Sequence, residues 1–250
     1  MNTLFTGELK AKINEHGIMA VLIVDEVKDA VPLARALLAG GVEIMELTLR
    51  TLAALEALKK IKAEVPEMTA GIGTILTPEQ VLVAKAAGAV FGVSPGMNPR
   101  VVAQAKEAGL PFAPGIATPS DIEAALEFGC RLLKFFPAET CGGIKHLKSI
   151  CAPYAHLGLK FVPLGGLTQE NFGVYLTLSV VTAVGGSWLA PREAIKNNDW
   201  QTITRNAAQA VATITTLRSK NQKNRDVRRS HGPVGPGGIF PPGASHARPA

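Results

Sequence analysis

Lys134 lies in the middle of a short run, RLLKFFPAE (residues 131–139), where its nearest neighbours are apolar. If this run is a buried strand, an ammonium group there costs several kcal/mol unless it is paired or neutralised. Burial favours the neutral amine, which is a nucleophile that forms Schiff bases with carbonyl compounds. The commoner alternative is a lysine at a strand end whose ammonium group reaches solvent. Residues on other strands must decide between the two.

Three polar side chains alternate with apolar ones in the segment EIMELTLR (residues 43–50). Successive side chains of a β-strand point to opposite faces, so Glu46, Thr48 and Arg50 share one face. Polar groups in successive inward positions are costly unless they pair or bind something. A structural Glu46–Arg50 salt bridge is one explanation. The other is a substrate site in which Arg50 holds a carboxylate through two parallel hydrogen bonds.

The same alternation places Lys134 and Phe136 on one face of their predicted strand. If that face points inward, Lys134 and Glu46 meet from separate strands. Such a pair suits carbonyl chemistry, because an iminium on the lysine withdraws electrons while the carboxylate moves protons. Thr74, which ends the segment GIGT (residues 71–74), adds a hydroxyl at the same edge.

Two glycine pairs occur near the end of the chain, in PLGGLT (residues 163–168) and GGSW (residues 185–188). Glycine lets backbone N–H groups approach an anion closely, and many barrels bind phosphate after their last two strands. The P-loop motif G-x-x-x-x-G-K-[ST] is absent. The pairs therefore predict an anion site of a different kind.

These residues need a scaffold, and the chain repeats one unit: an apolar run, a polar turn and a helical segment that ends in glycine. We expect strands at residues 19–24, 43–49, 69–75, 90–95, 111–117, 131–137, 160–166 and 180–187. We expect helices at residues 6–16, 27–39, 52–65, 78–87, 99–108, 120–128, 143–154, 169–176 and 199–217. Thr6 is a candidate helix cap, and the pairs Thr77-Pro78 and Thr118-Pro119 are typical of helix starts.

Strands that alternate with helices at roughly 20–25 residues per unit favour a parallel sheet with right-handed crossovers. The pattern predicts a single-domain α/β protein, a (β/α)8 TIM barrel over residues 1–217 with an N-terminal helix. Function in such a barrel lies at the carboxyl ends of the strands. An open doubly wound sheet is the alternative, but no G-x-G-x-x-G follows the first predicted strand.

The composition favours a soluble enzyme-sized domain. The 250 residues are 47% hydrophobic, and no apolar run approaches the roughly 18 residues of a membrane span. No signal peptide is evident at the start. Cys130, Cys141 and Cys151 lack zinc spacing, and an odd number argues against a disulfide framework. We therefore expect a cytoplasmic protein with no membrane partner.

The basic charge belongs to the last segment. From Arg218 onward there are seven Lys or Arg and one acid, which accounts for the whole net charge of +6. Residues 231–250 are also rich in Pro and Gly, and such a composition buries too little apolar surface to fold. We predict a disordered extension over residues 218–250. Its charge permits nucleic-acid binding, but no base-stacking aromatic lies among the basic residues.

The residues singled out above carry a family resemblance. The segments VEIMELTLRT (42–51), GIGTI (71–75), VSPG (93–96), KFFPAE (134–139) and GGSW (185–188) resemble the 2-keto-3-deoxy-6-phosphogluconate (KDPG) aldolases. These are class I aldolases, some of which also cleave 4-hydroxy-2-oxoglutarate. The similarity covers roughly residues 6–217.

The resemblance implies a homotrimeric (β/α)8 barrel that reversibly cleaves KDPG to pyruvate and glyceraldehyde 3-phosphate without metal or other cofactor. By position, Lys134 is the Schiff-base lysine and Glu46 the general acid and base. The implied substrate-binding residues are Arg50 and Thr74 for the carboxylate, Pro95 and Phe136 along the pocket, and Gly165, Gly166, Gly186 and Ser187 for the phosphate.

Three positions depart from the family pattern. Leu164, in the same pocket, stands where many members have Thr, and Leu52 stands where many have Pro. Asp25 and Glu26 follow the first strand, where members often carry a basic residue, so no phosphate-binding cation is evident there. The preference among KDPG, its galactose-derived epimer and 4-hydroxy-2-oxoglutarate stays open.

Two other functions compete with a Schiff-base lyase. A sugar-phosphate isomerase or decarboxylase would use Lys134 only for its charge. A non-enzymatic scaffold would build a larger assembly, natural or engineered, from trimers with a basic tail that binds nucleic acid or cargo. Apolar residues in segments expected to be exposed, Leu52, 81–83 and 173–175, motivate the assembly hypothesis.

Overall fold

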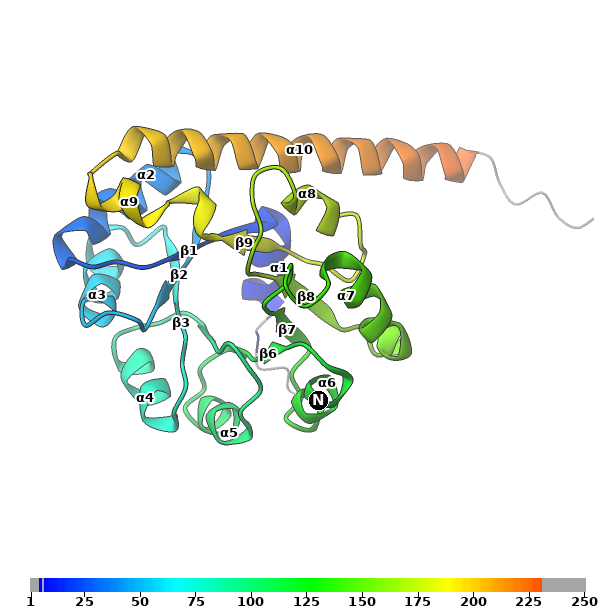
Figure 1. Cartoon of the computed structure of the whole chain (residues 1–250), viewed down its shortest axis with the longest axis horizontal. Helices are drawn as coiled ribbons and strands as arrows, with labels where there is room; N and C mark the ends of the chain where they lie inside the picture. Colours follow the sequence, from blue (N-terminus) through cyan, green and yellow to red (C-terminus); the bar gives the residue numbers. More distant parts are fainter. Residues whose placement is uncertain (1–4, 6, 231–250) are drawn as a thin grey trace, which may run out of the picture.

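Parallel strands line the centre of the molecule and helices surround them in a computed structural model that describes residues 5 and 7–230, with side chains up to residue 220 (Figure 1). The strands are β1 (Ile18–Leu22), β2 (Ile44–Thr48), β3 (Thr69–Gly73), β4 (Gly92–Val93), β5 (Phe112–Ala113), β6 (Gly115–Ile116), β7 (Leu132–Phe135), β8 (Lys160–Pro163) and β9 (Val184–Gly186). The α-helices are α1 (Gly7–His16), α2 (Ala30–Ala39), α3 (Ala54–Glu64), α4 (Pro78–Ala86), α5 (Pro99–Glu107), α6 (Pro119–Glu127), α7 (Gly143–Cys151), α8 (Phe172–Tyr175), α9 (Arg192–Lys196) and α10 (Trp200–Ser230). Short 3-10 helices are η1 (Val27–Asp29), η2 (Ala152–Leu157) and η3 (Ser187–Leu189).

Every predicted strand and helix overlaps an observed one. The predicted strand over residues 111–117 is observed as β5 and β6, which flank Pro114, because proline has no N–H to donate to a ladder. The sequence did not predict α9, since its 5 residues are too few to show a helical period. Thr6, the predicted cap of the first helix, lies outside the described residues.

The strands pair in parallel and follow the order of the chain. One sheet has six strands in the order β5-β4-β3-β2-β1-β9, and the other has three in the order β6-β7-β8. Two isolated bridges, Phe161–Val181 and Leu164–Gly185, join the chain at β8 to the chain at β9. The fold is therefore α/β with a curled parallel sheet, as the alternating pattern predicts.

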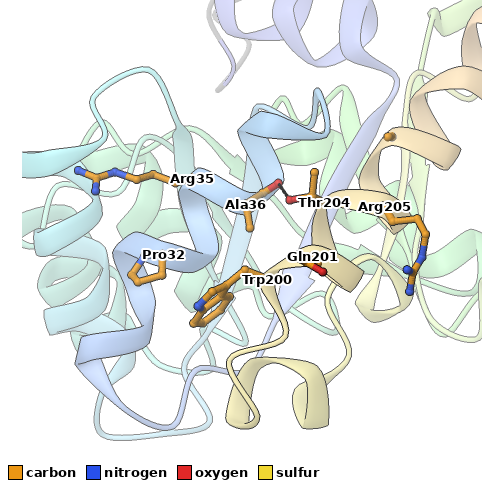
Figure 2. Close-up of a pocket in the computed structure, with 8 residues that line it drawn as sticks. Pro32, Arg35, Ala36, Trp200, Gln201, Thr204 and Arg205 are labelled. Atoms are coloured by element: carbon orange, nitrogen blue, oxygen red, sulfur yellow. Dashed lines mark hydrogen bonds between the residues drawn. The ribbon is translucent and has the colours of Figure 1, made fainter.

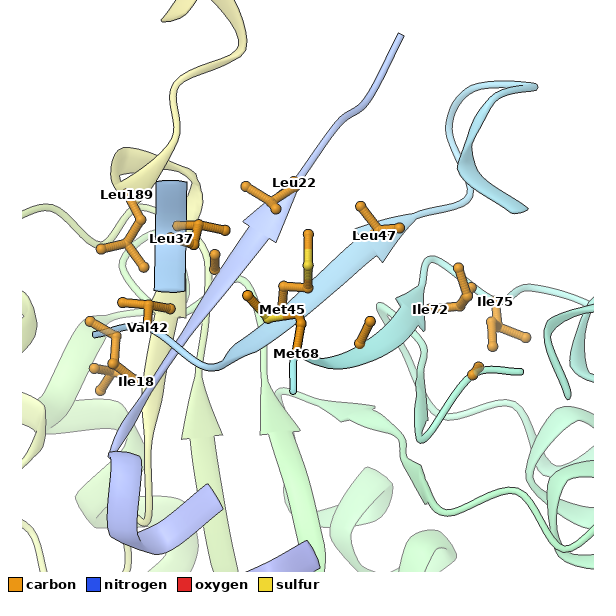
Figure 3. Close-up of a cluster of buried hydrophobic side chains, with 14 of the residues drawn as sticks. Ile18, Leu22, Leu37, Val42, Met45, Leu47, Met68, Ile72, Ile75 and Leu189 are labelled. Carbon is orange, nitrogen blue, oxygen red and sulfur yellow. The ribbon is translucent and has the colours of Figure 1, made fainter. Parts of the chain in front are cut away.

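The two faces of the strands carry separate apolar clusters. Outward side chains such as Met45, Leu47 and Ile72 form one cluster, which Figure 3 shows around β1, β2 and β3. Along β7, Leu133 belongs to this outward cluster and Leu132 to the inward one. Full burial of each side chain of this size stabilises the fold by about 1.5–3 kcal/mol relative to exposure to water. The predicted alternation of both strands is confirmed.

The N-terminal helix covers one end of the inward face. Leu9 and Ile13 of α1 pack with Met19 and Ile44, near the amino ends of β1 and β2. The next inward residue along β2 is Glu46, which is fully buried. Apolar packing therefore fills the amino-terminal end, and polar groups lie toward the carboxyl ends.

Two reciprocal caps fix the turns on the carboxyl side. The Thr77 hydroxyl accepts from the N–H of Gln80, whose side-chain oxygen accepts from the N–H of Thr77. Thr118 and Asp121 cap α6 in the same way. Each such cap stabilises its helix by about 1 kcal/mol. The predicted starts of α4 and α6 are thereby confirmed.

The last helix is longer than the sequence indicates. α10 runs along α2 and continues to Ser230, beyond the predicted end at residue 217 (Figure 1). The Arg218 guanidinium donates to the carbonyls of Asn14 and Glu15, which α1 leaves unpaired at its carboxyl end. The helix thus continues past residue 217, where the sequence pattern places its end. Residues 231–250 lie outside the described residues.

The apolar segments suspected of forming an assembly surface are only partly exposed. Their exposed side chains are Leu52, Leu82, Val83 and Val174. Val81 and Tyr175, from the same segments, are buried because the helical turn directs them toward the strands. These segments thus include the inner faces of α4 and α8.

Other expectations from composition concern thiols and membranes. Cys130, Cys141 and Cys151 are free thiols, and burial raises the pKa of Cys130 to about 12. The prediction that no disulfide framework exists is confirmed for these three residues. In the part of the chain that the structure describes, no helix is both long enough and apolar enough to cross a bilayer.

Candidate active site

Lys134 and Glu46 meet inside the curled sheet. The Lys134 Nζ lies 3.2 Å from Oε1 and 3.4 Å from Oε2 of Glu46. Their side chains are 7% and 0% exposed, respectively. The predicted meeting of lysine and carboxylate is confirmed, and both a solvated Lys134 and a Glu46–Arg50 salt bridge are excluded. A buried ion pair adds little net stability, so stability alone does not account for this pair.

Glycines make room for this pair. A Cβ added to Gly73 would lie 1.7 Å from Oε1 of Glu46, so only glycine lets the carboxylate lie across β3. Gly115 pairs in register with Lys134 and lies close to the backbone carbonyl of Pro95. A Cβ added to Gly115 would lie 2.1 Å from that oxygen. Sequence reasoning missed Gly73 and Gly115 as positioning residues, because their role depends on contacts between strands.

Replacing Gly73 by Ala should displace the Glu46 carboxylate. We expect overpacking to lower the free energy of unfolding by about 1–3 kcal/mol. The Lys134 amine should keep its place, while any reaction that depends on the Glu46 carboxylate should slow by about a hundredfold because the carboxylate is misplaced. Thermal unfolding and steady-state kinetics measure both effects. Gly7→Ala is the matched control, since a Cβ there meets nothing within 4 Å; equal activity in the two variants would contradict the assignment.

The other polar residues of β2 have separate roles. Thr48 donates to the backbone carbonyl of Leu22 at 3.0 Å, so it ties β2 to β1. Arg50 is exposed at the carboxyl edge, and its guanidinium forms no hydrogen bond or ion pair with any described residue. The predicted salt bridge to Glu46 is thus not formed, and the Arg50 guanidinium lies at the surface.

Thr74 holds a strained backbone at the end of β3. Its φ of 59° lies in the left-handed region, which a β-branched residue seldom adopts. Such a conformation costs about 1–3 kcal/mol and is concentrated at functional sites. The half-buried Thr74 thus lies at the predicted edge, next to the Gly73 that faces Glu46.

Apolar groups surround the lysine. The Phe136 ring centroid lies 5.2 Å from Nζ of Lys134. Leu164 and Lys134 line the same small cavity, of about 10 Å³. Gly115 lies against the backbone of Pro95 and pairs in register with Lys134 on the neighbouring strand. The structure therefore brings Phe136 and Leu164 to Lys134, whereas Pro95 lies against Gly115 on the neighbouring strand.

The two glycine pairs lie side by side. Gly165 and Gly166 have φ values of +96° and +79°, which favour glycine, and the Leu164–Gly185 bridge joins the two loops. Gly186 packs under the Trp188 ring, and Ser187 is exposed. Both predicted loops thus reach one edge of the sheet.

A cation that sequence reasoning missed lies at the end of β1. Arg192 of α9 donates to Asp25 through Nε at 2.8 Å and Nη2 at 2.5 Å. The hydrogen-bonded guanidinium holds the pKa of Asp25 below its usual range. The cation that α9 supplies, from 167 residues away, is held by the Asp25 carboxylate. A contact across that separation leaves no local signal.

A larger groove lies away from this chemistry. It measures about 580 Å³ and opens between α2 and α10, where Thr204 donates to the carbonyl of Ala36 (Figure 2). Its lining includes Trp200 and two arginines, Arg35 and Arg205. The described residues that line it include no lysine and no carboxylate. The groove therefore lacks the groups for Schiff-base chemistry.

Comparison with known proteins shows the family of the chain. The family model for KDPG and KHG aldolases matches residues 9–206. The chain belongs to the KDPG and KHG aldolase family. The match includes every predicted site residue and ends within α10, so the remainder of that helix lies outside it.

Three family members illustrate the similarity. The 2-dehydro-3-deoxy-phosphogluconate aldolase of Dickeya dadantii is 42% identical over 198 residues, which cover 79% of this chain and 92% of that protein. The KDPG aldolase structure from Legionella pneumophila is 39% identical with a TM-score of 0.77, covers 80% of this chain and 97% of its own, and holds pyruvate as a covalent carbinolamine. The structure of the KDPG aldolase from Zymomonas mobilis with 3-phosphoglycerate is 36% identical and has a TM-score of 0.76. The match covers 82% of this chain and 95% of that chain.

Proposed function

We propose that this chain is a class I aldolase that reversibly cleaves KDPG to pyruvate and glyceraldehyde 3-phosphate. The observation that carries the proposal is the buried contact of 3.2 Å between the Lys134 amine and the Glu46 carboxylate. Proton transfer from the ammonium to this carboxylate would supply the neutral amine that attacks a ketone. Family membership supports the same reaction.

The reaction begins at Lys134. Its neutral amine adds to the keto carbon of the substrate to form a carbinolamine. The carbinolamine hydroxyl then leaves as water with the proton that Glu46 took from the ammonium, which gives an iminium and returns Glu46 to its carboxylate form. The substrate hydroxyl on the β-carbon then gives its proton to Glu46 as the bond between the α- and β-carbons breaks. The electrons of that bond move into the iminium to form an enamine, and the aldehyde leaves.

The enamine then returns to pyruvate. Glu46 gives its proton to the α-carbon, which restores an iminium, and water hydrolyses this to pyruvate and free Lys134. The iminium serves as the electron sink in both directions, so the proposed chemistry needs no metal or other cofactor. One carboxylate serves as base and acid in turn, which suits its position beside the amine.

The remaining predicted residues would hold the substrate. Arg50 and Thr74 would bind the carboxylate of the pyruvyl part at the ends of β2 and β3. The walls would be Pro95, Phe136 and Leu164, and the phosphate would meet Gly165, Gly166, Gly186 and Ser187. Leu164 offers no hydrogen bond to a substrate hydroxyl. We therefore also propose 4-hydroxy-2-oxoglutarate as a second substrate.

Replacing Arg50 by Ala should raise the KM for every 2-keto acid substrate. A charge-assisted hydrogen bond contributes about 1.5–3 kcal/mol, which corresponds to roughly a tenfold to hundredfold change. Steady-state kinetics of pyruvate release measure this. Arg35→Ala, at an exposed arginine of the outer groove, is the control and should behave like the wild type. An unchanged KM in Arg50→Ala would remove Arg50 from the site.

The proposal extends to the architecture. The pairings from β1 through β8, with the bridges from β8 to β9 and the pairing of β9 with β1, support a closed (β/α)8 barrel. We propose that this barrel ends near residue 217, that helical residues 218–230 extend it, and that three copies form a homotrimer. Sedimentation would measure the number of copies.

Pyruvate release from KDPG tests the function directly. Lactate dehydrogenase with NADH reports pyruvate as it forms. A Schiff-base lyase releases one pyruvate and one glyceraldehyde 3-phosphate per KDPG. A decarboxylase would release carbon dioxide instead, and an isomerase would release neither. Failure to release pyruvate under these conditions would overturn the proposal.

A further inference from the structure

Tyr175 and Glu139 form a contact that the proposed reaction does not use. Tyr175, at the end of α8, is 2% exposed, and its hydroxyl donates to Oε1 of Glu139. Burial, together with the neighbouring Glu139, raises the pKa of Tyr175. The hydroxyl therefore stays a hydrogen-bond donor throughout the neutral range.

Glu139 lies against the first glycine loop. Its backbone N–H donates to the carbonyl of Gly165 at 3.1 Å, and that of Ala138 donates to Leu164 at 2.8 Å. A Cβ added to Gly166 would lie 2.7 Å from Cβ of Glu139. The chain just after β7 thus forms a wall of the loop that follows β8.

The short helix α8 is tied to both glycine loops. Asn171, just before α8, donates to the carbonyl of Gly166 at 3.2 Å and accepts from the N–H of Thr168 at 2.7 Å. Phe172 stacks on Trp188 with ring centroids 5.5 Å apart, and Gly186 packs under the same Trp188 ring. Because Tyr175 also donates to Glu139, which follows β7, α8 connects the two glycine loops to the end of the strand that carries Lys134.

We propose that the Tyr175–Glu139 hydrogen bond is a positioning device for the phosphate of the substrate, acting through the glycine loop of residues 165–166. This inference rests on the proposed function. Glycines restrict the backbone weakly, so the loop needs outside contacts to hold its N–H groups together for an anion. Without the tyrosine hydroxyl, the Glu139 carboxylate loses the hydrogen bond that holds its side chain against the loop. Neither residue touches the reacting carbons.

Tyr175→Phe tests the pair with two substrates, KDPG and its analogue without phosphate, 2-keto-3-deoxygluconate. We expect the KM for KDPG to rise about tenfold, the scale of one lost hydrogen bond to a charged group. The kcat for KDPG and the kinetics with the analogue should stay within about twofold of wild type. Inorganic phosphate should inhibit the variant about tenfold more weakly.

Tyr154→Phe is the matched control. The Tyr154 hydroxyl also donates to a glutamate, Glu123 at 2.7 Å, but it connects η2 to α6. We expect this variant to match the wild type with both substrates. The double variant Tyr175→Phe/Glu139→Ala should lose no more than either single change, because the two residues act as a unit. Glu139→Gln keeps an oxygen that accepts from Tyr175 and should retain the wild-type KM.

Three outcomes would overturn the inference: an unchanged KM for KDPG in Tyr175→Phe, an equal loss with both substrates, or additive losses in the double variant. An equal loss would indicate a general structural role. Should Tyr175→Phe not fold, Glu139→Ala, at an exposed residue, carries the same test. Wild-type protein that releases no pyruvate from KDPG would instead refute the proposed function, so the two failures are distinguishable.

Discussion

Lys134→Ala should abolish pyruvate release, with a fall in kcat of roughly four orders of magnitude or more. A covalent nucleophile has no substitute in the site, and its loss typically has effects on this scale. The change also leaves Glu46 buried without its partner, which can cost about 3–5 kcal/mol of stability. Steady-state kinetics and thermal unfolding, measured together, separate the two effects.

Two further variants isolate the chemistry of Lys134. Lys134→Arg keeps a cation beside Glu46 but cannot form an imine, so it should be as inactive as the alanine variant. Lys160→Ala removes another strand lysine, whose Nζ donates to the carbonyl of Ser179, and should keep full activity. Activity above about one hundredth of wild type in Lys134→Arg would indicate a role for charge alone.

Glu46→Gln should lower kcat by roughly a hundredfold to ten-thousandfold, the usual contribution of a general acid and base. The amide cannot accept a proton from the substrate hydroxyl or return one to the enamine. Exchange of the methyl protons of pyruvate with deuterated water, followed by NMR, should slow by a similar factor. This exchange needs imine formation and proton transfer to and from carbon but no cleavage of a carbon–carbon bond, so it isolates the role of Glu46.

Glu43→Gln is the control for that variant. Glu43 comes just before β2 and pairs with Lys12 at 3.5 Å and with His16 at 3.3 Å, at the amino-terminal side. We expect wild-type exchange and cleavage from it. If Glu46→Gln exchanged pyruvate protons at the wild-type rate, another group would be the base.

The sequence predicts the reactive pair because strand alternation is a local property. Once Glu46 and Lys134 are placed on inward faces of parallel strands, burial and carbonyl chemistry follow from residue type alone. The contact between them could be inferred without coordinates. The same holds for the caps at Thr77 and Thr118, where the motif and the structure agree.

Features that depend on distant segments were not predictable in this way. Gly73 accommodates a side chain from another strand, and Arg192 reaches Asp25 from a helix near the end of the domain. The composition after residue 217 predicts disorder, yet Arg218 binds the free carbonyls at the end of α1 and α10 continues to Ser230. In each case the partner, rather than the local sequence, determines the structure.

Trapping with pyruvate and sodium borohydride, followed by peptide mapping, tests the central claim most directly. Borohydride reduces an imine to a stable amine, so a Schiff base becomes a permanent mass label. We predict one pyruvate-derived adduct per chain, on Lys134, and none in Lys134→Arg. Absence of an adduct in active wild-type protein, or an adduct confined to another lysine such as Lys160, would contradict the account.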